Sequence, residues 1–230
     1  MRAAIHQPEH LPWFGFIHKI AKADKFIFLD NVQFKKNYFE NRNKIVTNQG
    51  MLWLTIPVKM KGHTSKKFNE ILIDNSIDWK RKYIKTLEQT YRRSPYYVDI
   101  LPIINLILNE RSLFLSDLNI NIIIKICELL KVDLDFVLAS EIDVLGKKSK
   151  LLVDILKKTN ASEYLMGRSS YDYINIDLFL DSKIKIIDHD FNYPDYIHFN
   201  YPEGFTKEVP SILDMIANLG ANKVSLLLNE

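Results

Sequence analysis

Residues 3–20 read AAIHQPEHLPWFGFIHKI, and this stretch predicts how the chain begins to fold. It opens as a short apolar strand, is interrupted by Pro8 and Pro12, and enters a helix whose first turn carries Trp13 and Phe14. Open α/β sheets bind ligands beside the loops at the carboxyl ends of their strands. A helix N-terminus adds free N–H groups and a partial positive charge that attract an anion. We therefore expect the functional site at this loop.

Size and composition indicate one large domain. The chain has 230 residues, of which 47% are hydrophobic and 26% are charged, so it can build a sizeable core. We expect a single α/β domain over residues 1–230. Within it, residues 31–75 are predicted to form a hairpin and flap insertion, and residues 78–131 a helical segment.

The cysteine content and the charge limit the class of protein. The single cysteine, Cys127, excludes an intramolecular disulfide and the usual Cys-based zinc sites, and its apolar surroundings predict a buried, inert thiol. No apolar run reaches the roughly 18 residues of a membrane span. With a reduced cysteine and no signal peptide, the cytoplasm is the expected compartment. A net charge of +3 is too weak to demand nucleic acid as a partner, and the composition is compatible with a homo-oligomer.

The first two strands predict which side chains meet. Residues 25–30 form an apolar run that ends in Asp30, which is typical of a buried parallel strand. With the strand at residues 2–6 and the helix after it, this run completes a βαβ unit. Asp30 and His6 then lie at the same sheet edge. We expect the imidazole of His6, the carboxylate of Asp30 and the guanidinium of Arg42 to share one cleft.

The rest of the chain alternates strands and helices, which predicts a mainly parallel sheet covered by helices on both faces, Rossmann-like or nucleotidylyltransferase-like. The predicted strands after the first two are 44–47 and 51–58 (a hairpin around 48–50), 68–73, 134–139, 162–166 and 183–188. The predicted helices after the first are 78–92, 97–109, 116–131, 148–159, 177–180 and 211–219, with Ser116 or Asp117 capping the third of these and Gly220 ending the last. Residues 59–67 form a basic loop that is a candidate flap.

The histidines of the opening stretch have two interpretations. His6 and His10 have the four-residue spacing of zinc ligands on a helix, but the prolines prevent that helix and no metal site is evident. A histidine beside a helix N-terminus can contact phosphate or act as a general acid or base. Alternatively, it only satisfies backbone groups of a tight turn. The layout resembles nucleotidylyltransferase-type α/β proteins, although Glu9 and His10 replace their glycine-containing pattern.

Residues spread over nearly the whole chain carry a closer resemblance. They are His6-Gln7-Pro8, Leu11-Pro12-Trp13, Gly15, Lys19, Asp24, Asp30, Gln33, Asn41-Arg42-Asn43, the run from Trp53 to Val58, Trp79, Tyr91, Pro95, Tyr164-Leu165, Gly167 and the run from Ser211 to Asp214. Through them the sequence resembles the WbqC-like protein family. It departs from the family pattern at His10, where Tyr is usual, at Tyr83 (His), at Met166 (Ser) and at His198 (Gln).

The resemblance implies a role in building O-antigen and other bacterial surface polysaccharides, including lipopolysaccharide. The activity it implies is that of a glycine (aminoacyl) transferase that acylates an amino sugar. On this reading His6 and Asp30 are the catalytic residues, either of which could accept a proton from the attacking amine. The substrate-binding residues would be Gln7, His10, Trp13, Gln33, Lys35, Asn41, Arg42, Asn43 and Gly167.

Those substrate-binding roles follow from side-chain chemistry. Arg42, Lys35 and Lys36 suit the phosphates of a sugar nucleotide. Trp13, Tyr38 or Trp53 could stack on it, while Asn41, Asn43 and Gln33 could bind hydroxyl groups. A turn that only holds the hairpin explains residues 41–43 equally well.

Three functions remain open from the sequence. The first is aminoacyl or similar acyl transfer to a nucleotide-linked amino sugar. Its small-molecule partners would be a nucleotide sugar and an acyl or amino-acid donor, for which activation with ATP is one option. The second is nucleotidylyl transfer with ATP. The third is a non-catalytic module that binds a sugar nucleotide or a nucleic-acid end.

Overall fold

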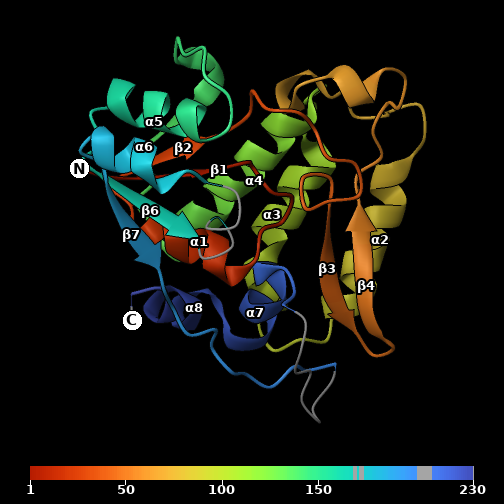
Figure 1. Ribbon diagram of the computed structural model, residues 1–230. Coiled ribbons are helices and arrows are strands. Elements are labelled where there is room, and N and C mark those ends of the chain that lie inside the picture. The colour runs from red at the N-terminus through yellow and green to blue at the C-terminus, as the bar shows by residue number, and fades with distance from the viewer. Residues whose placement is uncertain (168–169, 171–173, 201–208, 230) are drawn as a thin grey trace.

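The computed structural model describes residues 1–167, 170, 174–200 and 209–229. Its centre is a five-stranded sheet in the order β5-β2-β1-β6-β7, in which every pair of neighbours is parallel. An antiparallel hairpin, β3-β4, lies apart from this sheet (Figure 1). The strands are β1 (Arg2–His6), β2 (Lys25–Phe28), β3 (Arg42–Thr47), β4 (Gly50–Thr55), β5 (Phe136–Leu138), β6 (Glu163–Gly167) and β7 (Lys185–His189). The predicted α/β class is confirmed.

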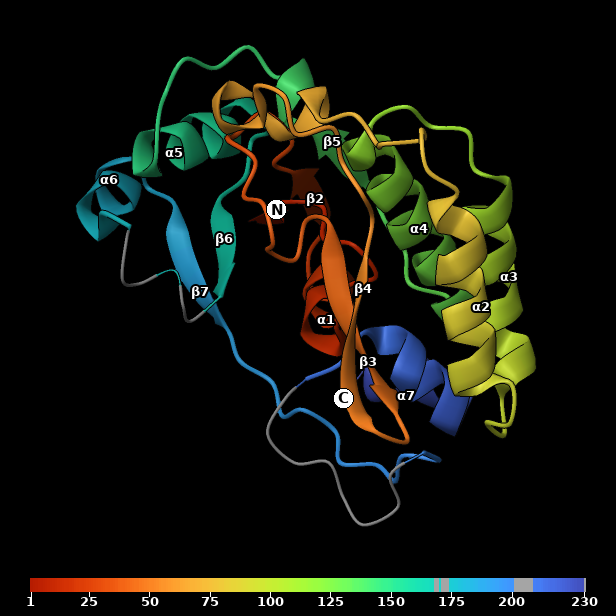
Figure 2. The ribbon, with the colours of Figure 1, turned by 90° about the vertical axis from the view of Figure 1, so that its right-hand side faces the viewer.

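Helices cover both faces of the parallel sheet, as Figures 1 and 2 show. They are α1 (Phe14–Ala21), α2 (Trp79–Tyr91), α3 (Tyr97–Asn109), α4 (Leu115–Leu130), α5 (Ser149–Lys158), α6 (Ile176–Asp181), α7 (Ile212–Leu219) and α8 (Ala221–Leu227). Among the described residues, no helix combines the length and the apolar character needed to cross a membrane.

Alternating side chains of the central strands build two separate apolar clusters. Ala3 and Ile5 belong to the cluster formed with α5 and α6, whereas Ala4 and Phe28 belong to the cluster formed with α1, α3, α4 and α7. Successive side chains of a strand point to opposite faces, so a strand covered on both faces must be apolar throughout. This is the physical reason for the continuous apolar run at β2.

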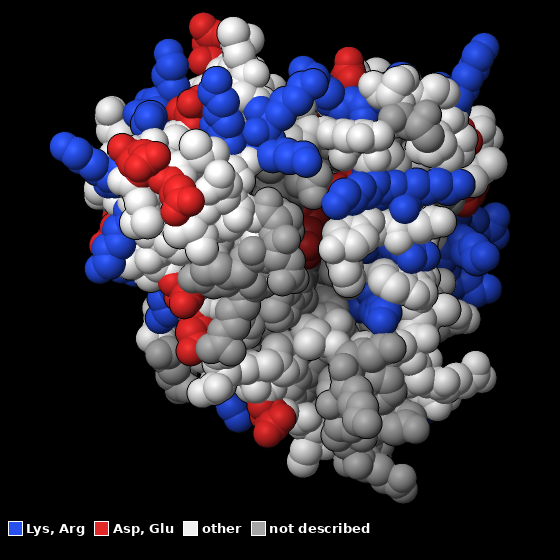
Figure 3. Space-filling view, in the orientation of Figure 1, with Lys and Arg blue, Asp and Glu red and all other residues white. Residues whose placement is uncertain are grey.

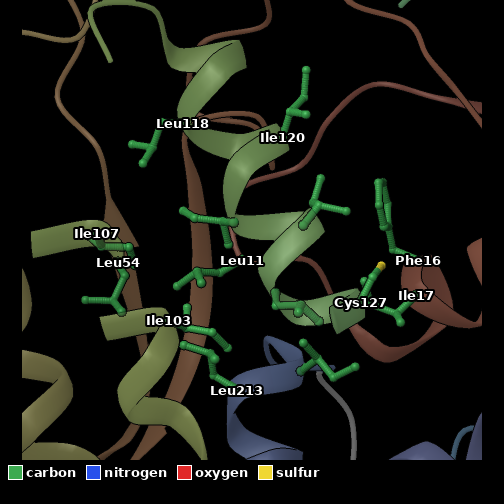
Figure 4. Close-up of a cluster of buried hydrophobic side chains, with 14 of the residues drawn as sticks. Leu11, Phe16, Ile17, Leu54, Ile103, Ile107, Leu118, Ile120, Cys127 and Leu213 are labelled. Carbon is green, nitrogen blue, oxygen red and sulfur yellow. The ribbon is translucent and has the colours of Figure 1, made fainter. Parts of the chain in front are cut away.

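The larger cluster joins the sheet to the hairpin and to the helical segment (Figure 4). Leu11, Leu54, Ile103 and Leu213 come from four separate segments and are all buried. Cys127 lies in the same cluster with 2% of its surface exposed, and burial raises the pKa of its thiol to about 12. The prediction that this thiol is buried is confirmed, and its raised pKa disfavours the reactive thiolate.

Two local predictions are wrong. Residues 68–73 do not form a strand: Phe68–Glu70 is a turn of 3₁₀-helix, closed by the Glu70 carboxylate, which accepts a hydrogen bond of 2.7 Å from the Lys67 N–H. Helix α4 does not start behind a Ser116 or Asp117 cap. It begins at Leu115, and its N-cap, Phe114, has no side-chain hydrogen bond.

The end of the chain is partly as predicted. Ser211 caps α7, its hydroxyl accepting from the Leu213 N–H at 3.3 Å. Gly220 ends α7 at a φ of 84°, where a Cβ would also lie 2.8 Å from the Tyr96 ring. Helix α8 then begins directly after Gly220, and no cap or periodicity predicted it.

The order of the strands determines where a ligand can bind. From β1 the chain proceeds outward on one side, through β2 to β5, and later returns to build β6 and β7 on the other side of β1. The order therefore reverses between β1 and β6. In open α/β sheets a crevice forms at such a switch point, outside the carboxyl ends of the strands.

Candidate functional site

A cavity of about 290 Å³ lies at this switch point, and we call it the switch-point pocket. Strand β1 contributes His6, α1 contributes Lys19, and β6 and β7 end in it with Gly167 and His189. Its remaining walls are Trp13, Gly15, Phe16, Asp190 and Phe191. The loop that follows β1 therefore borders a cavity, as its sequence predicts.

His6 is held in one tautomer by the backbone. Its Nδ1 lies 2.9 Å from the carbonyl oxygen of Gln7, which can only accept, so Nδ1 carries the hydrogen and Nε2 carries the lone pair. Loss of hydration between the pocket walls, together with the nearby charge of Lys19, lowers the pKa of His6. The ring is therefore neutral at pH 7 and Nε2 can accept a proton.

Lys19 places a buried cation in the pocket. The side chain is only 5% exposed, and its ammonium group makes no hydrogen bond and no ion pair within 4.0 Å to any residue that the structure describes. A Cβ at Gly167 would lie 3.9 Å from its Nζ, so the ammonium lies against the end of β6. Burial lowers the pKa of Lys19 to about 8, and the charge of Glu9 opposes this shift. Lys19 lines the pocket, so an anion bound there can contact its ammonium group.

One buried carboxyl group, that of Glu9, interacts with the charge of Lys19, and a second, that of Glu40, interacts with Glu9. Burial raises the pKa of Glu9 to about 8, although the charge of Lys19 opposes the change, and burial raises that of Glu40 to about 7. Glu9 Oε1 lies 3.9 Å from His6 Nε2. Glu9 Oε2 and Glu40 Oε1 are buried without a hydrogen-bond partner in the described chain. Burial favours the neutral form of Glu9, so this carboxyl group offsets the charge of Lys19 less than an exposed carboxylate would.

The outer surface near the site is also basic. In Figure 3, Lys and Arg side chains gather beside the crevice between the parallel sheet and the hairpin, and acidic atoms are visible deep inside it. The surface lysines and arginines would favour the approach of an anionic ligand, whereas acidic groups in the crevice would oppose its entry where they are ionised.

His18 and His189 form a pair beside the switch-point pocket, and His189 lines it. His18 Nδ1 lies 2.9 Å from His189 Nε2, and only one of these nitrogens can carry the hydrogen. Burial lowers the pKa of both rings, and Lys19 further lowers that of His189. The His18 ring also stacks on Phe191, with 5.1 Å between the ring centres. His189 is therefore a neutral, firmly positioned wall of the pocket.

The aromatic wall requires a glycine. A Cβ at Gly15 would lie 2.4 Å from both Trp13 Cη2 and Phe191 Cζ, closer than carbon atoms can approach. The two rings, whose centres are 5.6 Å apart, therefore close over the backbone of α1. This wall is apolar and limits the access of water to Lys19.

Comparison with protein families matches residues 7–226 to the WbqC-like protein family. The chain belongs to the WbqC-like protein family. The match begins directly after His6 and covers the other lining residues of the switch-point pocket. The chain is also 31% identical over 221 residues to the uncharacterized protein Rv1507c of Mycobacterium tuberculosis (strain ATCC 25618 / H37Rv), covering 96% of this chain and 94% of that relative. No solved structure matches it.

In this WbqC-like protein, three of the site residues predicted from the sequence meet in the switch-point pocket. They are His6, Trp13 and Gly167. Gln7 contributes the backbone carbonyl that orients the His6 ring. Glu9, Lys19 and His189 were not among the predicted site residues. Lys19 and Glu9 could have been identified from the sequence, because each is a charged residue in a stretch that otherwise buries apolar groups. His189 could not, because it reaches the site only through the pairing of β7 with β6.

His10 lies in the core and not in the pocket. It is fully buried, with Nε2 at 2.6 Å from the Tyr83 hydroxyl and Nδ1 at 3.1 Å from Asn119 Oδ1. His10 and Tyr83 are also two of the positions at which this sequence departs from the family pattern. In this chain the two side chains form a hydrogen bond with each other.

Asp30 has a different environment from His6, although β1 and β2 pair as predicted. It is 2% exposed and accepts from the Ser140 N–H at 2.8 Å, from the Ser140 hydroxyl at 2.5 Å and from Asn69 Nδ2 at 3.4 Å. Neither Asp30 nor Arg42 lines the switch-point pocket. The expected single cleft of His6, Asp30 and Arg42 is therefore not formed.

The other predicted binding residues lie around the hairpin. Asn41 donates to the Ile56 carbonyl at 3.1 Å, and Asn43 donates to the Leu11 carbonyl at 2.8 Å. These bonds favour the alternative that residues 41–43 hold the hairpin. The Arg42 guanidinium lies 4.1 Å from the centre of the Trp53 ring.

Two further predicted residues lie on the surface. Gln33 is exposed and pairs by its backbone with Lys67. Lys35 is also exposed, with its Nζ 5.5 Å from the centre of the Tyr38 ring. Among the described residues, no three His, Cys, Asp or Glu side chains are arranged to hold a metal ion.

Proposed function

We propose that this protein is a transferase that uses the switch-point pocket to acylate the amino group of a nucleotide-linked amino sugar, with an aminoacyl group such as glycyl as the transferred unit. The observation that carries the proposal is the buried ammonium of Lys19, which has no hydrogen-bond partner in the described chain and lies in one cavity with a neutral His6. Membership of the WbqC-like protein family supports the choice of surface-polysaccharide assembly as the setting.

Lys19 would bind the anionic part of a substrate. A phosphate or carboxylate in the pocket can accept charge-assisted hydrogen bonds from the ammonium group, which are stronger than neutral ones. The apolar wall of Trp13 and Phe191 strengthens this attraction because it lowers the local dielectric.

His6 would act as the general base. As the amino nitrogen attacks the acyl carbon, a C–N bond forms, the bond from that carbon to its leaving group breaks, and the proton of the amine moves to His6 Nε2. An acyl adenylate made from ATP is the class of donor that supplies such a leaving group. Positioned general bases typically contribute about 10²- to 10⁴-fold to a rate.

Nucleotide binding to Lys19→Met tests the anion site. Isothermal titration calorimetry with ATP and with uridine diphosphate sugars should show an affinity at least about 10-fold lower in Lys19→Met, because a charge-assisted hydrogen bond contributes about 1.5–3 kcal/mol. Lys82→Met, which removes an exposed lysine of α2, is the matched control and should bind as the unaltered protein does. Equal affinity in Lys19→Met would contradict the proposal.

Mass spectrometry separates the chemical alternatives. After incubation with ATP, glycine and amino-sugar nucleotides, a glycyl mass increment on the sugar is expected, and His6→Ala should abolish it. Pyrophosphate release without acylation would indicate nucleotidylyl transfer instead. Ligand-dependent thermal stabilisation with no turnover would indicate a non-catalytic binding module.

A further inference from the structure

A second, larger cavity lies at the same edge of the sheet. It has a volume of about 830 Å³ and lies where β2 and β5 end, and we call it the β2–β5 cavity. Its lining includes Asn31, Asn69, Ser140 and Phe114, with Lys66 and Lys67 beside them. Strand β2 pairs directly with β1, and the Leu29 N–H donates to the His6 carbonyl at 2.8 Å. The β2–β5 cavity and the switch-point pocket therefore adjoin neighbouring strands.

Two amide side chains of this cavity have fixed orientations. Asn31 Nδ2 donates to the Ala139 carbonyl at 3.1 Å, and Asn69 Nδ2 donates to the Asp30 carboxylate at 3.4 Å. Both partners can only accept, so each amide must turn its NH₂ group toward its partner and its Oδ1 away from it. Asp30 is itself held in place by Ser140.

Both amide oxygens lack a hydrogen bond. Asn31 Oδ1 and Asn69 Oδ1 are buried atoms without a partner in the described part of the chain. Buried acceptors are almost always satisfied in native proteins, and an unsatisfied one is a cost that a ligand can remove. Because both atoms are acceptors, the ligand that satisfies them must donate hydrogen bonds.

The remaining lining narrows the class of ligand. Phe114 is 38% exposed and offers an apolar surface at the cavity wall. Serine and acidic side chains add further acceptors at Ser140, Glu70 and Glu141. A ligand that fits these acceptors and this apolar surface needs hydroxyl donors and an apolar C–H face. A saccharide ring has both features.

We propose that the β2–β5 cavity is a saccharide-binding site in which Asn31 and Asn69 accept hydrogen bonds from ring hydroxyl groups. The assignment of this saccharide as the acceptor sugar rests on the proposed function. The binding of a saccharide does not, because it is argued from the two amides and the other lining residues of this cavity. Asp30 then serves as a positioning residue, since it orients Asn69 and Ser140.

Saturation-transfer difference NMR with simple glycosides tests this site without a nucleotide. The probes are the methyl glycosides of glucose, galactose, glucosamine and galactosamine. At least one should bind to the unaltered protein, and Asn31→Ala and Asn69→Ala should each weaken that binding about fivefold to tenfold, the loss expected for one hydrogen bond. Asn105→Ala, on the exposed face of α3, is the control and should bind normally.

The outcomes of this experiment are separable from those of the proposed function. Absence of binding by all four glycosides, or binding unchanged in both Asn31→Ala and Asn69→Ala, would overturn the saccharide site. Thermal unfolding of each variant, monitored in parallel, shows that a loss of binding occurs in a folded protein. Lys19→Met should leave glycoside binding intact, and loss in Lys19→Met alone would place the saccharide in the switch-point pocket instead. If nucleotides fail to bind while glycosides bind as expected, the transferase proposal fails and the saccharide site stands.

Discussion

Two buried charges at one edge of the sheet have opposite surroundings. Asp30, behind β2, accepts hydrogen bonds from the Ser140 backbone, the Ser140 hydroxyl and Asn69. Lys19, beside β1 and β6, has no hydrogen bond to any described residue and lies in a cavity. A buried charge with a full set of partners stabilises the fold, and a buried charge without them costs stability. The difference distinguishes Asp30, whose hydrogen bonds hold the fold, from Lys19, which we propose binds an anionic ligand.

The largest expected effect is on stability, and it contrasts the two charges directly. Asp30→Ala should lower the free energy of unfolding by about 3 kcal/mol, because it removes three hydrogen bonds to a buried carboxylate. Lys19→Met should change it by less than about 1 kcal/mol or raise it, since an apolar side chain replaces an unsatisfied cation. Urea unfolding measures both, with Asp133→Ala as an exposed control. A loss of more than about 2 kcal/mol in Lys19→Met would show that the lysine is structural and break the comparison.

A smaller effect concerns the pH dependence of stability near Lys19. Burial raises the pKa of Glu9 from 4.5 to about 8, so between these values the folded protein binds a proton that the unfolded chain has lost. Stability must then fall as the pH rises through this window. Relative to Glu9→Gln, the unaltered protein should lose about 2 kcal/mol of unfolding free energy between pH 5 and pH 6.5.

Urea unfolding over that pH range, on both proteins, measures this difference. The comparison with the variant removes the contribution of Glu40, which titrates in part of the same range. Parallel curves for the two proteins would show that Glu9 is not a protonated, buried carboxyl group.

The smallest expected effect concerns His10 and Tyr83, an uncharged pair in the core whose side chains form a hydrogen bond with each other. His10→Tyr alone and Tyr83→His alone should each lower the free energy of unfolding by about 1–2 kcal/mol, because neither leaves the hydrogen bond of 2.6 Å intact. The double exchange should recover about 1 kcal/mol of that loss, as a coupling free energy in a double-mutant cycle. Additive losses would mean that the two residues do not act as a pair.

Local pattern was sufficient wherever one segment determines its own structure. The apolar runs at β1 and β2 and the break at Pro8 and Pro12 predicted the βαβ start, and Asp78 predicted the cap of α2, where it accepts from the Arg81 N–H at 3.4 Å. Turn chemistry was harder to anticipate. The Glu70 carboxylate closes a short turn in a stretch whose composition is typical of a strand.

The sequence by itself determined the α/β class, the family and the position of the loop after β1, because apolar periodicity and local motifs are short-range properties. Only the tertiary structure decided which charges are satisfied. Asp30 meets Ser140 across 110 residues, and His18 meets His189 across 171. Such contacts depend on which strands lie side by side, and strand order is set by the packing of the whole chain. For that reason the switch-point pocket is lined by Lys19 and His189 together with His6, and not by Asp30 and Arg42.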